Sequence, residues 1–236
     1  EPDADTHTKT VETIIPKSSI TLMVESRIEA LTVSTPVASI TFRDKTLSTI
    51  SEEASGDIKI TISRVDSSIL SDEFKQIIGD RPVFDFSVTG GDMTISQFGG
   101  NIEVSVPYTP KEDEDTKAIV ICYINAESKL EIVCNCVYNH ETGTVSFKTN
   151  HFSTYAVGYN KINFNDVAAN AWYSDAVGFI AARGITKGTG GGNYEPEGKL
   201  TRGQFIVMLM RAYNIKPDEN PKDNFSDAGN TYYTGY

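Results

Sequence analysis

Residues 164–215 carry the strongest periodic signal in the chain, and that signal is helical. In the first half of this stretch, apolar side chains recur at spacings of i, i+4, i+7 and i+8, at Trp172, Ala176, Phe179 and Ile180. This spacing places them on one face of a helix over residues 172–183, so Trp172 is expected in the core and Tyr173 is free to be exposed. A second helix with similar spacing follows Thr201, beyond a glycine-rich loop. The two apolar stripes are expected to meet, which predicts a helical hairpin.

Each predicted helix has its own start and stop signals. Asn170 can cap the first helix, and Gly184 can supply the left-handed residue that ends it. At the start of the second helix, Thr201 and Gln204 have the spacing of a capping box. The apolar stripe of the second helix consists of Phe205, Met208, Leu209, Ala212 and Tyr213.

The order of motifs in this stretch resembles the S-layer homology (SLH) family. Phe-x-Asp-Val at residues 164–167 is followed by Trp172, Ala-x-x-Gly-Ile, Gly-x-Tyr-x-Pro and Leu-Thr-Arg-x-x-Phe. The resemblance implies that residues 160–221 form one SLH repeat of an exported bacterial protein. It also implies a function, because members of the family anchor proteins to cell walls by binding secondary cell wall polysaccharides, often ones that bear pyruvate ketals. The family generally works with three repeats, so neighbouring SLH repeats are implied partners.

The motif that opens the second helix singles out Arg202. In the family this motif is commonly Thr-Arg-Ala-Glu, and its arginine contacts the acidic sugar, whereas here Gly203 and Gln204 replace the alanine and the acid. Apart from the family, the N–H groups of a helix N-terminus attract an anion, and a planar guanidinium suits a carboxylate. The alternative is a solvated surface arginine. We expect Arg202, with Thr201, Gln204 and the aromatic Tyr173, to bind the wall polymer.

Charge is distributed unevenly along the chain. The formal net charge is −11, which argues against nucleic acid as a partner. Residues 161–236 hold eight Lys or Arg and eight Asp or Glu, so the acidity lies in residues 1–160. A neutral helical part can approach an anionic polymer that the acidic part would repel. No apolar run is long enough for membrane insertion, and the start at Glu1 is interpreted as that of a processed, exported fragment.

The three cysteines, Cys122, Cys134 and Cys136, are too few for a zinc site or a disulfide framework, and their spacing fits neither. They fall in predicted strands, where a free cysteine behaves as a small buried hydrophobe. If these strands pair, Cys122 can bridge to either Cys134 or Cys136. The histidines are scattered and no acidic loop has the pattern of a calcium site, so neither a metal nor a cofactor is expected.

Residues 13–159 have the pattern of an antiparallel β-sandwich that follows a polar linker at residues 1–12. Eight or nine short strands with alternating apolar residues are expected, including a hairpin with its turn at residues 90–91. Two helices are predicted within this region, over residues 18–31 and 71–78. The first of these helices is expected to point three side chains inward, those of Leu22, Val24 and Ile28. We expect the region to fold without the helical repeat.

The β-region resembles accessory domains that precede SLH repeats in exported Firmicute proteins. The resemblance rests on Val-Pro-Tyr-Thr-Pro at residues 106–110 and His-Phe-Ser-Thr-Tyr-Ala at residues 151–156. It carries no assigned activity and implies a spacer or adhesion module. Near the end, Phe-Ser-Asp-Ala at residues 225–228 and Tyr-Tyr at residues 232–233 repeat the order that opens the SLH motif, so residues 222–236 are expected to begin a second repeat.

The segment His151-Phe152-Ser153 is the one enzyme-like feature. It resembles the self-cleavage motif of β-sandwich domains in certain animal receptors and death-domain proteins, in which the serine attacks the preceding peptide bond and the histidine is the base. That chemistry needs a hydroxyl against a strained carbonyl and a base within hydrogen-bond reach. The alternative is that Phe152 belongs to the core and Ser153 is an exposed strand residue.

We interpret the chain as mainly β plus α, with an antiparallel β-sandwich domain followed by an α-helical hairpin SLH repeat. The expected function is that of a non-enzymatic, extracellular anchor that binds pyruvylated secondary cell wall polysaccharide in the cell wall or S-layer. One alternative is a carbohydrate-binding module, which a row of exposed aromatic rings would favour, with Tyr108, Tyr123 and Tyr138 as the candidates. The other alternative is a domain that cleaves itself between Phe152 and Ser153.

Overall fold

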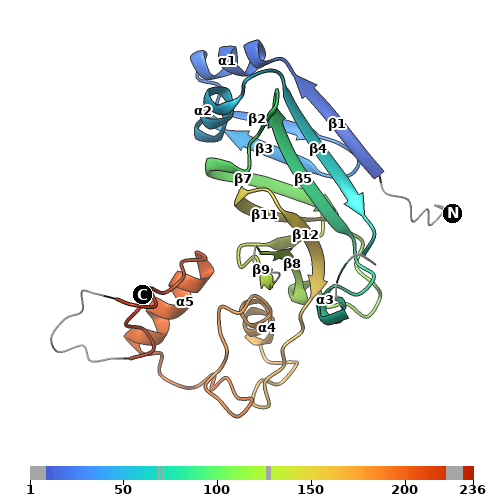
Figure 1. Cartoon of the computed structure of the whole chain (residues 1–236). Helices are drawn as coiled ribbons and strands as arrows, with labels where there is room; N and C mark the ends of the chain where they lie inside the picture. Colours follow the sequence, from blue (N-terminus) through green and yellow to red (C-terminus); the bar gives the residue numbers. More distant parts are fainter. Residues whose placement is uncertain (1–8, 68–69, 71, 126–128, 222–230) are drawn as a thin grey trace.

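Alternating apolar residues build two antiparallel sheets whose inner faces share one hydrophobic core (Figure 1). The computed structural model describes the whole chain except residues 1–8, 68–69, 71, 126–128 and 222–230. Within the described part, the core joins residues of both sheets, such as Ile60 and Val104. The predicted antiparallel β-sandwich is confirmed.

The larger sheet has the strand order β1-β4-β5-β12-β8-β9, and β6 pairs with β5. Its strands are β1 (Lys9–Ile15), β4 (Ile58–Val65), β5 (Val83–Gly90), β6 (Met93–Thr94), β8 (Ile119–Ile124), β9 (Leu130–Ile132) and β12 (Thr154–Tyr159). Because Lys9–Ile15 pairs with β4 along its whole length, residues 9–12 belong to the sandwich and not to a linker. Their polar side chains lie on an edge strand that faces water, and polar composition alone does not distinguish such a strand from a linker.

The smaller sheet has the strand order β10-β11-β7-β3-β2. Its strands are β2 (Ala30–Ser34), β3 (Ser39–Arg43), β7 (Gln97–Pro107), β10 (Val137–Asn139) and β11 (Thr144–His151). The pleat of β7 buries Ile102, Val104 and Val106, which alternate with polar residues along the strand. In the larger sheet, the predicted hairpin at residues 90–91 is confirmed by the pairing of β5 with β6.

Two helices pack together at one end of the sandwich, α1 (Lys17–Glu25) and α2 (Asp44–Glu53). The helix predicted over residues 18–31 ends early, because Arg27 adopts a left-handed conformation with φ of 55°. It buries Ile20, whereas Leu22 and Ile28 are exposed, so the predicted inward face is wrong. Sequence reasoning missed α2, whose residues are mostly polar and which buries Leu47 through its contacts with the sheet and α1.

Helix α3 (Asp72–Ile78) lies against β12 and ends, as predicted, at Gly79 with φ of 59°. The predicted cap Ser71 lies outside the described residues. After β12 the chain leaves the sandwich and forms α4 (Ser174–Ala182) and α5 (Arg202–Ala212). In Figure 1, α4 lies beneath the end of the sandwich that carries β8 and β9, and α5 lies to one side of it. The fold class of a β-sandwich followed by a helical region is confirmed.

Candidate functional site

The Phe-x-Asp-Val motif holds the glycine-rich loop between the two helices. The carboxylate of Asp166 accepts hydrogen bonds from the backbone N–H of Tyr194 at 2.8 Å and of Glu195 at 2.7 Å. The N–H of Asn165 donates to the carbonyl of Gly192 at 2.9 Å. The hydrogen bonds from Tyr194 and Glu195 lower the pKa of Asp166. The aspartate of the motif therefore fixes the conformation of the loop through these hydrogen bonds.

Helix α4 docks on the sandwich through small side chains. Val177, Ala181 and Ala182 are buried, and Ala182 belongs to the sandwich core. The predicted apolar face is therefore wrong, since Trp172 is 92% exposed and Ala176 is also exposed. The helix begins only after Trp172, so the indole does not follow the helical periodicity. Small side chains on the buried face let the helix approach the sandwich closely.

The predicted end of α4 is confirmed, but its predicted start is not. Gly184 has φ of 68°, and the N–H groups of Gly184 and Ile185 donate back to carbonyls of the last turn, at 2.9 and 3.0 Å. At the other end, Tyr173 occupies the N-cap position and its side chain makes no capping hydrogen bond. Asn170 therefore does not cap this helix, because the helix starts later than the periodicity suggested.

Arg183 fastens α4 to the sandwich. Its side chain is 1% exposed, and its guanidinium donates to the carbonyls of Cys136 at 2.8 Å, Lys117 at 2.9 Å and Ile119 at 3.2 Å. The guanidinium carbon lies 3.5 Å from the ring centre of Phe179. Burial lowers the pKa of Arg183. Because the guanidinium donors are rigid and directional, these contacts fix both the position and the rotation of α4.

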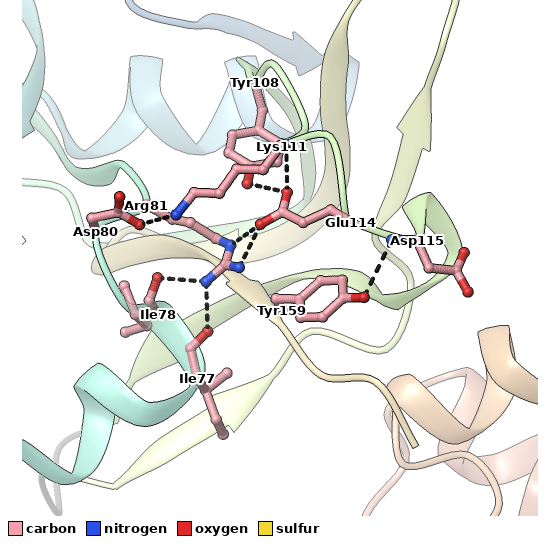
Figure 2. A network of polar contacts seen from close by, with 9 residues as sticks. All are labelled: Ile77, Ile78, Asp80, Arg81, Tyr108, Lys111, Glu114, Asp115 and Tyr159. Carbon is pink, nitrogen blue, oxygen red and sulfur yellow. Dashed lines mark hydrogen bonds and ion pairs between the residues drawn. The ribbon is translucent and has the colours of Figure 1, made fainter. Parts of the chain in front are cut away.

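A buried polar network braces the end of the sandwich beside this docking site (Figure 2). The carboxylate of Glu114 accepts hydrogen bonds from Nε of Arg81 at 2.9 Å, from the hydroxyl of Tyr108 at 2.5 Å and from the N–H of Lys111 at 3.1 Å. Although burial opposes the shift, these hydrogen bonds hold the pKa of Glu114 below its ordinary value. Tyr108 belongs to the Val-Pro-Tyr-Thr-Pro motif, so this motif has a structural role.

Tyr159, the last residue of β12, connects this network to α4. Its hydroxyl accepts from the N–H of Asp115 at 3.2 Å, as Figure 2 shows. Asp115 in turn caps the 3-10 helix η2 (Thr116–Ala118) by accepting from the N–H of Lys117 at 3.0 Å. The ammonium of Lys117 lies 3.4 Å from the carboxylate of Asp175 on α4. These contacts thus fix the end of β12, from which the chain enters the helical region.

The start of α5 has the predicted capping box. Oγ1 of Thr201 accepts from the N–H of Gln204 at 3.2 Å, and Oε1 of Gln204 accepts from the N–H of Thr201 at 2.8 Å. Arg202 is the first residue of the helix, and its side chain is exposed. Within the described part of the chain, Arg202 makes no ion pair and its guanidinium makes no hydrogen bond, so this cation is available to a ligand.

A groove of about 700 Å³ opens beside α5. Among the residues that line it are four charged side chains and two aromatic rings, those of Lys187, Lys199, Arg211, Glu195, Tyr194 and Tyr232. Three cations and one carboxylate make the groove positive, in a chain whose formal net charge is −11. Gln204 also lines the groove, whereas Arg202 and Tyr173 do not.

The apolar stripe of α5 is largely uncovered. Phe205, Leu209 and Tyr213 are 54%, 40% and 74% exposed, and Val207 is the one buried residue of this helix. The two helices therefore do not cover each other's stripes in the way that the predicted hairpin required. The reason is that the buried face of α4 packs against the sandwich and not against α5.

Comparison with known proteins identifies this helical region. A family model described as the S-layer homology domain matches residues 163–206. The chain carries an S-layer homology domain. An amylopullulanase of Thermoanaerobacterium thermosulfurigenes is 34% identical over 142 residues, which are 58% of this chain and 8% of that protein. The S-layer protein sap of Bacillus anthracis is 32% identical over 73 residues, which are 31% of this chain and 9% of that protein.

The similarity to one relative extends beyond the SLH domain into the sandwich. The match to the amylopullulanase is longer than the 74 residues from Asn163 to the end of the chain, so it extends into the sandwich. The endo-1,4-beta-xylanase A of Thermoanaerobacterium saccharolyticum is 37% identical over 67 residues, which are 28% of this chain and 6% of that protein. The chain spans less than a tenth of the length of these relatives.

The SLH domain and the S-layer relatives place this chain at the cell surface. Its relatives include S-layer proteins and proteins named as enzymes. Among the described residues, no helix has the length and apolar character needed to cross a bilayer.

The SLH domain brings together three of the four predicted binding residues. Thr201, Arg202 and Gln204 share the first turn of α5 or flank it, whereas Tyr173 precedes α4. Tyr173 is half-buried, and its ring packs edge-on against Trp172 with ring centres 5.5 Å apart. The exposed indole of Trp172, which was expected in the core, is therefore the more accessible ring.

Sequence reasoning missed the cations of the groove. Lys187 and Lys199 flank the glycine-rich loop, and Arg211 lies in the last turn of α5. The neutral balance of the SLH region was a signal that cations gather there, but not where they meet. Asp166 lies in the Phe-x-Asp-Val motif, but the motif alone does not predict its hydrogen bonds to Tyr194 and Glu195.

The structure does not bring His151 and Ser153 together. The hydroxyl of Ser153 donates to the carbonyl of Ile124 at 3.2 Å, whereas Nδ1 of His151 lies 3.1 Å from Oδ1 of Asn150. Phe152 packs into the aromatic core of the sandwich. Within the described residues no hydrogen bond joins the histidine to the serine, so the serine lacks the base that self-cleavage needs.

The three tyrosines considered for sugar binding do not form a row. Tyr108 is buried in the Glu114 network, Tyr123 lies on β8 of the larger sheet, and Tyr138 lies on β10 of the smaller sheet. A planar platform needs aromatic rings on one exposed face. These three rings therefore give no support to a carbohydrate-binding face on the sandwich.

All three cysteines are free thiols. Cys122 lies in β8, whereas Cys134 and Cys136 lie between β9 and β10 and not in strands. Burial raises the pKa of Cys122 to about 12, so its thiol is unreactive. The part of the chain that the structure describes contains no group of three or more His, Cys, Asp or Glu residues that could hold a metal ion.

Proposed function

We propose that this chain is part of a cell-wall anchor whose SLH domain binds an anionic secondary cell wall polysaccharide. The observation that carries the proposal is the positive groove beside α5, where Lys187, Lys199 and Arg211 face a hollow of about 700 Å³. A pyruvate ketal presents a carboxylate on a sugar ring. Charge-assisted hydrogen bonds from lysine and arginine suit that group, and Tyr194 and Tyr232 can contact the apolar faces of sugar rings.

Arg202 is a second contact for the polymer in this proposal. It lies at the same end of α5 as Gln204, which lines the groove, and its side chain is exposed. The first N–H groups of a helix have no partner within the helix, so the helix end adds to the attraction for a carboxylate. The polymer would then extend from the groove across the start of α5.

The exposed stripe of α5 is where neighbouring repeats are proposed to pack. Phe205, Leu209 and Tyr213 present a continuous apolar face that one repeat leaves uncovered. Repeat proteins commonly bury such faces by stacking adjacent units. The sandwich is proposed to act as a spacer or adhesion module, and its docking on α4 would fix its orientation relative to the wall.

A wall-binding assay with a matched charge control tests the proposal. The whole anchor protein that contains this chain is purified and mixed with cell walls before and after chemical removal of the secondary polymer, and the bound fraction is measured by sedimentation. Lys187→Ala with Lys199→Ala is expected to weaken binding at least about ten-fold, because two charge-assisted contacts are lost. Lys59→Ala with Lys148→Ala, on the sandwich, removes the same charge away from the groove and is expected to have little effect.

Binding that persists on walls without the secondary polymer would contradict the proposed ligand. Equal loss of binding in the groove variant and in the sandwich variant would contradict the proposed site, because net charge alone would then explain the effect.

A further inference from the structure

Gly203, in the first turn of α5, lies directly against the ring of Tyr233. A Cβ atom built on Gly203 would lie 2.5 Å from Cδ1 and 2.6 Å from Cε1 of this ring. Such distances are far inside van der Waals contact, which lies near 3.5–4.0 Å. The tyrosine therefore packs on bare helix backbone, and any larger residue at position 203 would displace it.

A second close approach fixes the same segment near the end of α5. The N–H of Asp218 donates to the carbonyl of Gly235 at 2.8 Å. A Cβ atom on Gly235 would lie 2.6 Å from the carbonyl oxygen of Asp218 and 2.9 Å from Cβ of Pro217. Gly203 thus lets Tyr233 contact the start of α5, and Gly235 lets the last segment contact the residues that follow α5.

The ring pair of this segment repeats the pair that precedes α4. Tyr232 and Tyr233 are edge-to-face, with ring centres 5.1 Å apart and planes at 82°. Trp172 and Tyr173 have the same arrangement, with ring centres 5.5 Å apart and planes at 82°. Tyr233 therefore occupies the position that Tyr173 has in the first repeat. The predicted match of residues 225–228 to the start of the SLH motif lies outside the described residues.

We propose that Gly203 is the contact site on which the following SLH repeat docks, with Tyr233 as the side chain that fits it. The partner is the next repeat of the same chain. Glycine is a poor helix former, and this contact gives a physical reason for its presence in the first turn of α5. Docking also places Tyr232 among the lining residues of the positive groove. That last consequence rests on the ligand in the proposed function, whereas the docking rests on the contacts of Gly203 and Gly235.

Two glycine-to-alanine substitutions of opposite expected sign test the docking. Gly178 lies within α4, and a Cβ atom there would meet nothing within 4 Å. Gly178→Ala is therefore expected to raise the urea midpoint of unfolding, because alanine favours the helix. Gly203→Ala is expected to lower the midpoint, because the new methyl group displaces Tyr233. In a Tyr233→Ala background, Gly203→Ala is expected to become stabilising, as Gly178→Ala is.

A direct readout uses the Hα resonances of Gly203 in an NMR spectrum. The adjacent tyrosine ring is expected to shift them, and Tyr233→Ala is expected to return them toward ordinary helical values. Tyr232→Ala removes the neighbouring ring, whereas the three atoms nearest to a Cβ at Gly203 all belong to Tyr233, and this variant serves as the control. If the Gly203 resonances do not respond to Tyr233→Ala, the docking is wrong.

Two further outcomes overturn the docking. One is a Gly203→Ala variant that is stabilised as much as Gly178→Ala, and the other is strict additivity of the Gly203 and Tyr233 substitutions. Wall binding by the same variants separates the two proposals. Coupling between Gly203 and Tyr233 without any wall binding by the whole parent anchor supports the docking and overturns the proposed function. Wall binding without coupling between Gly203 and Tyr233 supports the proposed function and overturns the docking.

Discussion

Two arginines of the SLH domain show how burial separates a structural side chain from one available to a ligand. Arg183 is buried, and its guanidinium donates to backbone carbonyls of the sandwich and its own helix. Arg202 is exposed at the start of α5, and the described residues offer its side chain no ion pair. Buried polar groups need partners, whereas an exposed guanidinium can exchange water for a ligand carboxylate.

Replacing Arg183 with alanine is expected to lower the free energy of unfolding by about 3 kcal/mol, because buried carbonyls lose charged donors. Arg183→Lys is expected to be intermediate, since one ammonium cannot match the fork of the guanidinium. Urea unfolding followed by circular dichroism measures both, with Arg202→Ala as the exposed control. An Arg183→Ala variant with the urea midpoint of the parent would show that the arginine does not hold α4.

Replacing Arg202 with alanine is expected to weaken binding to pyruvylated wall polymer about ten- to a hundred-fold, because a charge-assisted hydrogen bond contributes roughly 1.5–3 kcal/mol. Stability is expected to stay level or rise, since a cation in the first turn faces the positive end of the helix dipole. Lysine should restore part of the affinity. The measurement is sedimentation with walls, using the whole anchor protein that contains this chain. Full binding by Arg202→Ala would make the arginine irrelevant to the ligand.

At the scale of elements, α4 and α5 end alike but are packed differently. Gly184 and Asn214 both adopt left-handed backbones, with φ of 68° and 57°, and both are followed by an isoleucine whose N–H donates back into the helix. The sandwich covers the buried face of α4, whereas most of the stripe of α5 is exposed. Helix α5 therefore depends more on its own caps than α4 does.

Removal of the capping box is expected to act locally on α5. Thr201→Ala should cost about 1 kcal/mol of helix stability, because the N–H of Gln204 loses its acceptor. In Thr201→Ala, amide hydrogen exchange should accelerate in α5 and remain unchanged in α4. Ser174→Ala, at the first residue of α4, is the control. Equal acceleration in both helices would mean that the two unfold as one unit.

At the scale of the whole molecule, an ion pair ties the segment that follows α5 back to the sandwich. Nζ of Lys216 lies 2.9 Å from Oε2 of Glu131, and the same carboxylate accepts from Tyr123 at 2.8 Å and Asn125 at 2.6 Å. The hydrogen bond from Lys216, with those from Asn125 and Tyr123, lowers the pKa of Glu131 to about 2. Together with Arg183 and the ion pair of Lys117 with Asp175, this contact joins the helical region to the sandwich.

This pKa shift predicts a loss of stability in acid. A carboxylate with a lowered folded pKa stabilises the protein above its unfolded pKa, near 4.3, and loses that contribution as pH falls through the folded value. The urea midpoints of the parent and of Glu131→Gln are expected to differ at pH 6 and to converge as the pH falls from about 4 toward about 2. Parallel pH profiles would contradict the role of this ion pair. The variant isolates Glu131 from Glu114 and Asp166, whose pKa values are also lowered.

The sequence by itself determined the features that depend on near neighbours. Strand alternation predicted the sandwich, the capping box at Thr201 and Gln204 was recognised from spacing, and Gly184 was recognised as the end of α4. The motif order also predicted the SLH domain. These features succeed because their hydrogen bonds and periodicities join residues only a few positions apart.

Only the tertiary structure decided which surfaces meet. It placed the buried face of α4 at Val177, Ala181 and Ala182, exposed Trp172, and made Arg183 structural. It also gathered the cations of the groove and set Tyr233 on Gly203. The separation of the sandwich from the SLH domain at residue 159 stays a prediction, since Ala182 lies in the sandwich core. The physical reason is that each of these contacts joins residues distant in sequence, and their meeting depends on the packing of the whole chain.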